Sequence, residues 1–535
     1  MEFNPSEYPY ASRRNTVYAK NGMVATSQPL AAQAGLDMLK KGGNAIDAAI
    51  AAAACLTVVE PTSNGIGGDA FALVWVKDQL HGLNASGPSP RSISIEAVKR
   101  AGYTEMPVYG FIPVTVPGAP AAWKALSERF GKLPLTETLR PAIEYARQGY
   151  PLTPTLGYYW ASAVRHLQAK TAGDPFSSWF ETFAPEGRAP RIGEVWRSPG
   201  HASTLQSIAE SGAESFYRGE LAEKIDRFSK QYGGFISAAD LAEYEPEWVT
   251  PVSVNYRGFD VWEIPPNGQG MVALMALNLL KGFDFAGQGD AETVHNQIEA
   301  MKLAFADGLH YITQQDKMTA SVEALLSEDY TLKRRALMTG RAGSPAAGEP
   351  PKGGTVYLSA ADGEGNMISY IQSNYMGFGS GLVVPGTGIA LQNRGHTFSL
   401  DPGHSNRLEP GKKTYHTIIP GFLSKDGKAV GPFGVMGGFM QPQGHVQVVM
   451  NMIDFRLNPQ AALDAPRWQW IKDKTVHVEA SFPEPVVEAL KEKGHHIERI
   501  TGSGTFGRGQ IILRDEHGVL AGGTEPRTDG CIAAW

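Results

Sequence analysis

A short Gly/Pro-rich segment divides this chain into two unlike parts. Residues 339–354 read TGRAGSPAAGEPPKGG, in which eight of the sixteen residues are Gly or Pro. Proline fixes φ and removes a backbone donor, so this segment suits neither a helix interior nor a central strand. The residues that follow, 355–361, read TVYLSAA, which is a strand pattern. We therefore predict an irregular connection that ends directly at the start of a strand.

The chain before this segment is predicted to be rich in helices, and the chain after it in strands. Apolar residues recur with helical spacing over 28–41, 45–58, 119–130, 139–148, 203–211, 219–231, 270–280 and 291–310, and a strand is expected at 70–76. Later strands are expected at 355–361, 367–373, 382–391, 416–425, 429–438, 475–480, 495–500, 509–515 and 518–525, with helices at 443–452, 459–464 and 483–492.

Charge and composition exclude several classes of protein. The 535 residues carry 48 basic and 54 acidic side chains spread along the chain, so no basic stripe for nucleic acid is present. The first twenty residues lack the apolar core of a secretory signal, and the apolar run at 45–60 is too short to span a bilayer. Only two cysteines occur, which is typical of a reducing compartment. We expect a cytoplasmic protein that binds neither nucleic acid nor membrane.

The junction between Gly354 and Thr355 suggests a specific chemistry. If the Thr355 hydroxyl attacks the Gly354 carbonyl, no side chain obstructs the attack, and the peptide bond becomes an ester that water cleaves. Thr355 then becomes an N-terminus whose α-amino group titrates near neutral pH and can act as a base. One residue thus supplies both nucleophile and base. A threonine that merely begins a strand is the alternative interpretation.

Several motifs, in one order along most of the chain, favour the chemical interpretation. They are GGNAIDAAIAAA, NGIGGDAF, PPNGQGMVALMALNLLKGFD, EAMKLAFADGLHYI, TVYLSAADGEGN, FGVMGG and TEPR. From about residue 19 to 530, the sequence resembles the γ-glutamyltransferase family of N-terminal-nucleophile hydrolases. The resemblance implies a four-layer αββα sandwich made as a proenzyme, without a cofactor. It also implies cleavage into a large subunit (1–354) and a small subunit (355–535) that stay together as an αβ heterodimer.

The resemblance also implies catalytic roles for particular residues. Thr355 falls at the nucleophile position, and Ser373 falls where the family has a hydroxyl residue needed for processing. Gly437 and Gly438 match the glycine pair whose backbone N–H groups form the oxyanion hole. The alternatives are a solvent-facing strand hydroxyl for Ser373 and a simple strand-to-helix turn for the glycines.

The substrate pocket of the family is altered here. Ser86 stands where the family has an arginine, and His416-Thr417 replaces a serine pair; both family features hold the substrate α-carboxylate. Thr397 stands at the position of the aspartate that holds the α-amino group, Arg394 replaces a polar glutamine, and Tyr375 replaces an asparagine. An arginine suits a planar carboxylate. We expect a small-molecule amide that bears a carboxylate and lacks the usual free amine; a surface arginine and a structural histidine remain alternatives for Arg394 and His416.

The segment between Phe398 and His416 is shorter than the lid loop of the family's best-known bacterial members, which favours water over an amine as acyl acceptor. Glutathione hydrolase activity, an acylase of the oxamate amidohydrolase or cephalosporin acylase type, and an unprocessed binding protein remain open. No metal site is predicted, because His495 and His496 lack the spacing of a helical zinc pair. The glycines at 502, 504 and 507 precede a strand, so they are not a dinucleotide motif.

Overall fold

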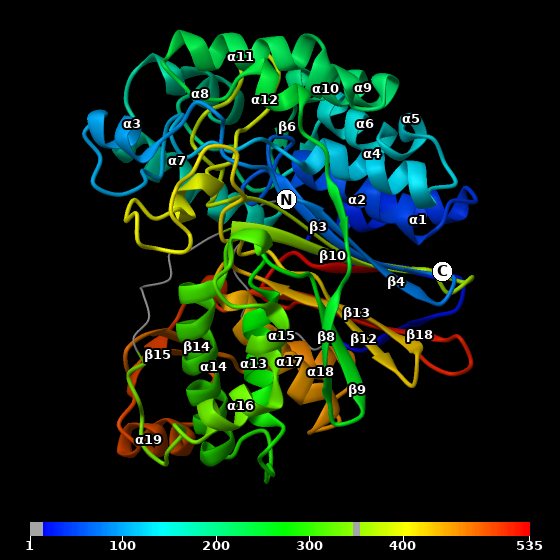
Figure 1. Cartoon of the computed structure of the whole chain (residues 1–535). Helices are drawn as coiled ribbons and strands as arrows, with labels where there is room; N and C mark the ends of the chain where they lie inside the picture. Colours follow the sequence, from blue (N-terminus) through cyan, green and yellow to red (C-terminus); the bar gives the residue numbers. More distant parts are fainter. Residues whose placement is uncertain (1–13, 346–353) are drawn as a thin grey trace.

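The computed structural model of the chain describes residues 14–345 and 354–535. The N-terminal segment and most of the Gly/Pro-rich connection, for which predictions were made above, therefore lie outside the described residues. Two seven-stranded sheets lie face to face between two layers of helices (Figure 1). This arrangement confirms the predicted αββα sandwich.

Both sheets are antiparallel throughout. The first contains, in spatial order, β1 (Val17–Ala19), β18 (Leu520–Thr524), β17 (Arg508–Arg514), β13 (Lys428–Met436), β12 (Gly421–Lys425), β9 (Phe259–Glu263) and β8 (Val252–Tyr256). The second contains β19 (Cys531–Ala534), β2 (Gly22–Thr26), β10 (Gly354–Asp362), β11 (Met367–Tyr375), β3 (Asp69–Val76), β4 (Gln79–Ala85) and β7 (Glu247–Val249). Each sheet takes strands from both sides of the Gly/Pro-rich segment, so the two parts of the chain build one fold.

Two helical layers cover the outer faces of the sheets (Figure 1). The layer on the second sheet holds α1 (Pro29–Lys40), α2 (Ala45–Val59), α4 (Ala119–Phe130), α5 (Leu135–Thr138), α6 (Arg140–Gln148), α7 (Pro154–Lys170), α8 (Ser177–Phe183), α9 (Pro199–Ser211), α10 (Glu214–Arg218), α11 (Glu220–Gln231) and α12 (Ala238–Ala242). The layer on the first sheet holds α13 (Gly270–Leu280), α14 (Ala291–Tyr311), α15 (Val322–Leu326), α16 (Glu328–Arg335), α17 (Met440–Ile453), α18 (Pro459–Asp464) and α19 (Glu484–Glu492). Smaller elements are α3 (Ile95–Arg100), the sheet of β14 (Trp468–Lys472), β15 (Thr475–Glu479) and β16 (His496–Ile500), and the pair β5 (Tyr150–Pro151) and β6 (Val195–Trp196).

The Ala-rich helix α2 lies at the centre of its layer. All of its side chains are buried, as the sequence predicted. Asn44 caps its start by accepting hydrogen bonds from the backbone N–H groups of Ile46 and Asp47. Small side chains let neighbouring elements approach closely: a Cβ on Gly35 of α1 would lie only 2.9 Å from the carbonyl oxygen of Ala48. The helix therefore serves as packing and not as a membrane segment.

An apolar layer between the sheets positions β10 against β13. The rings of Trp75 and Phe422, one from each sheet, stack with centroids 5.7 Å apart. A Cβ on Gly434 in β13 would lie 2.5 Å from the ring of Tyr357 in β10, so glycine is required for this contact. The contact holds the strand that starts at Gly354 close to the strand that ends at Met436.

Two strand predictions are wrong, and several elements were missed. Residues 382–391 form only isolated bridges, because Gly386 and Gly388 both take positive φ in tight turns. In 416–425, the strand begins only at Gly421, after Pro420, which cannot donate to a ladder. The seventeen-residue helix α7 was not predicted, because its aromatic cluster obscures the helical period.

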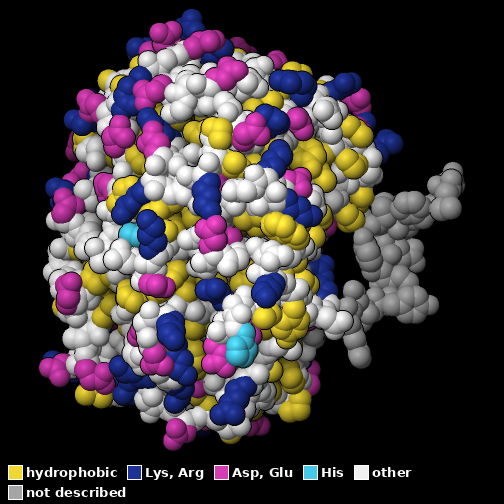
Figure 2. Space-filling view, turned by 90° about the vertical axis from the view of Figure 1, so that its right-hand side faces the viewer, with side chains coloured by type: hydrophobic (Ala, Val, Ile, Leu, Met, Phe, Trp, Pro, Cys, Tyr) yellow, Lys and Arg dark blue, Asp and Glu magenta, His cyan; other side chains and the backbone are white. Residues whose placement is uncertain are grey.

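One face of the surface carries charges of both signs. Acidic and basic side chains are intermixed over the face shown in Figure 2. No helix within 14–345 or 354–535 is both long and apolar enough to cross a membrane. Cys55 is buried in α2 and Cys531 is partly exposed in β19, and both are free thiols.

Candidate active site

Thr355 lies at the second residue of β10, where the strand is irregular. The pairing of β10 with β11 shifts register between Gly354 and Val356, and Gly354 lies opposite Tyr375. Tyr375 has a φ of 77°, which is unusual for a residue with a side chain. Residues with a side chain that are held at positive φ are strained, and such residues cluster at functional sites. Tyr375 is one of them, and it lies opposite the predicted cleavage point.

The Thr355 hydroxyl is buried and lies next to a second hydroxyl. Its Oγ1 is 3.1 Å from the Oγ of Ser373 on the neighbouring strand β11. The same Ser373 Oγ accepts a hydrogen bond from the backbone N–H of Tyr375 at 2.8 Å. The alternative of a solvent-facing serine is therefore wrong, since Ser373 is fully buried. The side-chain amide of Asn374 lies beside Gly65 and Gly68. Neither its nitrogen nor its oxygen has a hydrogen-bond partner among the described residues, and the sequence analysis did not single it out.

Arg394 is a buried cation with spare donors. Its Nη1 donates to Thr417 Oγ1 at 2.7 Å, and its guanidinium lies 4.3 Å from the centre of the Tyr375 ring. Its Nε and Nη2 have no partner among the described residues. Burial lowers the pKa of Arg394 to about 10, so the group stays charged at neutral pH. The structure excludes a surface arginine here, because Arg394 is fully buried.

His416 forms a pair with Asp69, an acid that the sequence analysis missed. His416 Nε2 lies 3.0 Å from Asp69 Oδ2, and the other carboxylate oxygen accepts hydrogen bonds from Gly87 N and Gln392 Nε2. Burial raises the pKa of Asp69 to about 7 and holds the pKa of His416 well below its usual value. The available signal was the acid directly after the glycines in NGIGGDAF; in the structure, Asp69 is the register partner of Ser373 on the adjacent strand.

The glycine pair Gly437-Gly438 lies between β13 and α17. Gly437 has a φ of 138° and Gly438 a φ of 61°, so this turn favours residues without a side chain. Gln269 fixes the turn from outside, because its Nε2 donates both to Gly438 O at 2.8 Å and to Thr417 O at 2.6 Å. Gln269 lies within the quoted PPNGQGM motif but was not predicted as a site residue.

Two predicted substrate residues have their hydrogen bonds satisfied inside the protein. The Thr397 hydroxyl donates to backbone carbonyls of Arg394 and Tyr415, each at 2.9 Å. Ser86 lies in a network with Asn84 and Asn267, and Asn267 O accepts a hydrogen bond from His416 N. Both hydroxyl groups are thus hydrogen-bonded within the protein, and their role in binding substrate stays a prediction.

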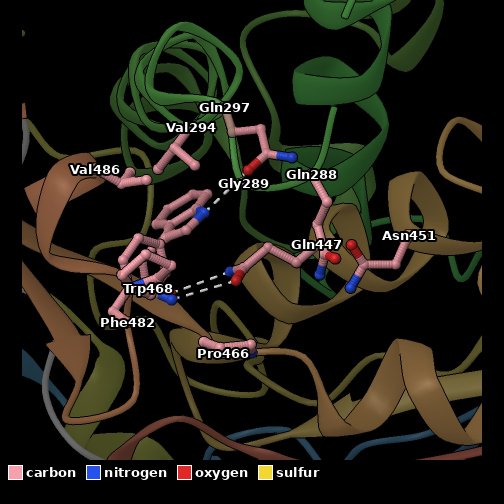
Figure 3. Close-up of a pocket in the computed structure, with 11 residues that line it drawn as sticks. Gln288, Gly289, Val294, Gln297, Gln447, Asn451, Pro466, Trp468, Phe482 and Val486 are labelled. Atoms are coloured by element: carbon pink, nitrogen blue, oxygen red, sulfur yellow. Dashed lines mark hydrogen bonds between the residues drawn. The ribbon is translucent and has the colours of Figure 1, made fainter. Parts of the chain in front are cut away.

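A continuous series of contacts gathers the predicted residues into one buried site. It runs through Gly438, Gln269, Thr417, Arg394, Tyr375, Ser373 and Thr355. By contrast, the cavity of about 100 Å³ between α14, α17 and β14, drawn in Figure 3, is lined by none of them. The site thus brings a pair of buried hydroxyl groups, Thr355 and Ser373, into the same set of contacts as the buried guanidinium of Arg394.

Comparison with known proteins places this site in a family. The model of the gamma-glutamyltranspeptidase family matches residues 31–535. The chain belongs to this family. The resemblance drawn from the sequence is thereby confirmed, and with it the assignment to hydrolases and acyltransferases.

The relatives of this gamma-glutamyltranspeptidase family member span several substrates. The glutathione hydrolase-like YwrD proenzyme of Bacillus subtilis is 36% identical, covering 96% of this chain and 98% of the relative. The oxamate amidohydrolase proenzyme of Klebsiella pneumoniae is 34% identical, with the same two coverages of 96% and 98%. Among solved structures, cephalosporin acylase from Bacillus halodurans is 64% identical with a TM-score of 0.98, covering 100% of this chain and 99% of that one.

Proposed function

We propose that this chain is a proenzyme that cleaves itself between Gly354 and Thr355 and then hydrolyses amides whose acyl group carries a carboxylate. In cleavage, the Thr355 hydroxyl adds to the Gly354 carbonyl, the peptide C–N bond breaks, and the amine of Thr355 takes the proton. Water then hydrolyses the ester that links the two parts. The products, 1–354 and 355–535, remain together because both sheets contain strands of each.

In turnover, the free Thr355 amine acts as base for its own hydroxyl. The hydroxyl attacks the substrate carbonyl, the amine leaving group departs with a proton, and an acyl ester forms. Water then cleaves this ester and restores the threonine. Backbone N–H groups of Gly437 and Gly438 would stabilise the oxyanion, and the hydrogen bond from Gln269 to Gly438 O, which fixes their turn, supports this role.

The unpartnered Nε and Nη2 of Arg394 carry the substrate proposal. A buried guanidinium with two free donors is costly unless a ligand supplies an acceptor, and a carboxylate matches this geometry. Asp69, an acid whose charge acts on Arg394, already bonds Gly87, Gln392 and His416, so it does not offer an unused receptor for an ammonium group. The names of two relatives, an oxamate amidohydrolase and a cephalosporin acylase, agree with an acyl specificity beyond γ-glutamyl groups.

Self-cleavage is tested on the purified full chain by denaturing gel. We expect the 57.6 kDa chain to give two bands, near two-thirds and one-third of that mass. Thr355→Ala should stay as one band with no amidase activity, whereas Thr355→Ser keeps a hydroxyl and should be cleaved more slowly. A wild-type chain that remains single after long incubation while hydrolysing amides would contradict the proposal.

The substrate class is tested with three p-nitroanilides on the cleaved enzyme. Glutaryl-p-nitroanilide has the acyl chain of γ-glutamyl-p-nitroanilide without the amine, and the butyryl compound has neither amine nor carboxylate. We expect the glutaryl compound to have the highest kcat/KM and the butyryl compound the lowest. A γ-glutamyl rate far above the glutaryl rate would show that the site recognises an amine.

We also propose that the protein is cytoplasmic, which the presence of only two cysteines supports.

A further inference from the structure

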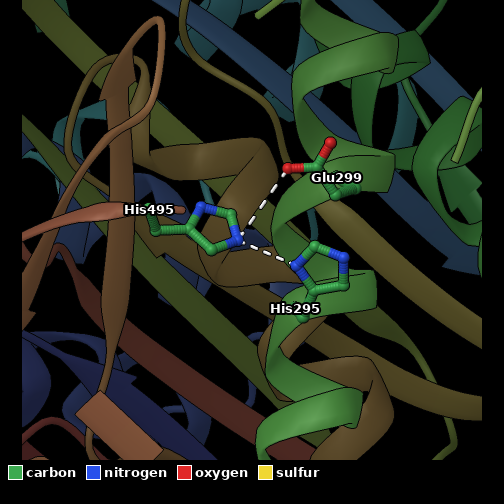
Figure 4. Close-up of side chains that lie close together, drawn as sticks. All are labelled: His295, Glu299 and His495. Atoms are coloured by element: carbon green, nitrogen blue, oxygen red, sulfur yellow. Dashed lines mark hydrogen bonds and ion pairs between the residues drawn. The ribbon is translucent and has the colours of Figure 1, made fainter. Parts of the chain in front are cut away.

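A second cluster of buried polar groups lies in the other helical layer. His295 and Glu299 are one turn apart on α14, and His495 comes directly before β16. All three side chains are buried and point toward one another (Figure 4). We propose that His295, Glu299 and His495 bind a divalent transition-metal ion, and that Zn²⁺ is the ion that fits them best.

The ligand atoms are close enough to share one ion. One ligand atom from each residue lies within 4.8 Å of the others. His495 Nε2 is 2.8 Å from His295 Nδ1 and 3.9 Å from Glu299 Oε1. Zinc bonds of about 2.0–2.1 Å in tetrahedral geometry put ligand atoms about 3.3 Å apart. The two imidazole nitrogens would therefore move apart by about 0.5 Å, and Glu299 Oε1 would approach His495 Nε2 by about 0.6 Å.

Surrounding hydrogen bonds already orient the ligands for a metal. His295 Nε2 lies 2.7 Å from the carbonyl oxygen of Thr339, so this nitrogen carries the proton and Nδ1 presents its lone pair. Glu299 Oε2 accepts from Gly343 N at 3.0 Å, which leaves Oε1 toward the histidines.

One nearby cation has to be accommodated. Lys302 Nζ donates to Glu299 Oε1 at 2.7 Å and to Gly343 O at 2.9 Å. A carboxylate oxygen has two lone pairs, and metal-bound carboxylates are commonly hydrogen-bonded by a neighbour. Lys302 can therefore keep its hydrogen bond while the second lone pair of Oε1 faces the ion.

An entry path and a fourth ligand are available. Glu299 and Gly343 line a cavity of about 440 Å³ that also borders Asp307 and His310. Two histidines and one glutamate leave one tetrahedral position for water, and Glu299 is the ligand that this cavity reaches. This set differs from the His495-His496 pair considered in the sequence, because the partner histidine comes from α14 and not from the adjacent residue.

The position of the site gives the metal a structural role. His295 and Glu299 lie before the proposed cleavage point and His495 lies after it. Thr339 and Gly343, which bond the ligands, belong to the described start of the Gly/Pro-rich segment. A bound ion would therefore fasten the end of the large part to the small part once the chain is cut.

The experiment uses the full chain, stripped with chelator and then titrated with Zn²⁺ and with Co²⁺ as a spectroscopic probe. We expect one equivalent of Zn²⁺ to be retained through dialysis, the Tm to rise, and Co²⁺ to give the intense visible absorption of a four-coordinate site. His295→Ala and His495→Ala should lose all three signals. His496→Ala removes the exposed neighbouring histidine and should leave them unchanged.

Glu299→Gln keeps the shape of the side chain and removes one charged ligand, so it should weaken Zn²⁺ binding by at least tenfold without loss of folding. If wild type retains no Zn²⁺ and shows no Co²⁺ absorption, the proposal is wrong, whatever the stability of the alanine variants. Equal retention by wild type and by both alanine variants would also overturn it.

Discussion

Two buried arginine clusters in this molecule differ in how completely their charges are satisfied. Arg467 bonds the carbonyls of Phe506 and Gly507 and pairs with Glu525 at 2.9 Å. Arg527, from the TEPR motif, bonds both oxygens of Glu479 as well as Glu525. Arg394, in contrast, has one side-chain hydrogen bond and two donors left over.

Under the function proposed above, the salt bridges of Arg467 and Arg527 hold the fold, whereas the charge of Arg394 is there to bind a ligand. A buried ion pair with complete hydrogen bonding contributes little net stability, yet breaking it is strongly destabilising. A buried cation with free donors costs stability until an acceptor arrives, which is the usual condition of a binding site. The two clusters should therefore respond to similar substitutions in opposite ways.

Arg467→Met should give the largest effect, and the effect should be on stability. Removing this guanidinium leaves the buried carboxylate of Glu525 with one charged partner fewer, so the free energy of unfolding should fall by about 3–5 kcal/mol. Denaturant unfolding measures it, and the folded fraction should retain near-normal kcat/KM. An unchanged midpoint would show that the pair is not structural.

Arg394→Met should instead affect catalysis. Loss of the carboxylate receptor should lower kcat/KM for the glutaryl anilide roughly 100-fold, the fold-change typical of truncating one partner of a buried charge pair. The unfolding midpoint should hold or rise, because an incompletely paired buried charge has been removed. The butyryl anilide serves as control, since its rate should change little. A large fall in the free energy of unfolding, with equal falls in kcat/KM for both anilides, would show that Arg394 is structural in the same way as Arg467.

Asp69→Asn should give the smallest effect, visible as a change in pH dependence. Because burial raises the pKa of Asp69 to about 7, the carboxyl is protonated below that pH and leaves the Arg394 charge undiminished for a substrate. Above it, the ionised Asp69 offsets Arg394, so KM for the glutaryl anilide should rise severalfold across this range. The asparagine variant should show a flat KM. Persistence of the wild-type pH profile in this variant would assign the titration to another group.

The sequence predicted the architecture well where local patterns were strong. The helices α4 and α13 begin and end at the predicted residues, and β10 and β11 were found as a hairpin. The prediction of a strand at 382–391 was wrong, because the apolar residues there are buried in irregular turns and do not pair in a sheet. A buried irregular segment has no regular spacing of apolar residues, so the spacing rules for strands (every two residues) and helices (every 3.6 residues) do not detect it.

For the site, the family resemblance predicted roles for Thr355, Ser373, Arg394 and the glycine pair. A series of contacts links Thr355, Ser373, Arg394 and Gly438, and the roles themselves stay predictions. Asp69 and Gln269 were missed, although both lie inside the quoted motifs. Their importance depends on partners more than 140 residues away along the chain, Asp69 with His416 and Gln269 with Gly438. Only the packing of the two sheets reveals such pairs.

The interleaving of strands from both parts of the chain has a consequence for maturation. Thr355 meets Ser373 only when β10 pairs with β11, and β10 also pairs with β2 from the N-terminal region. A chain that has not assembled the second sheet would lack the geometry for the cleavage proposed above. Activation would then act as quality control, in which only correctly folded molecules ever acquire a reactive N-terminus.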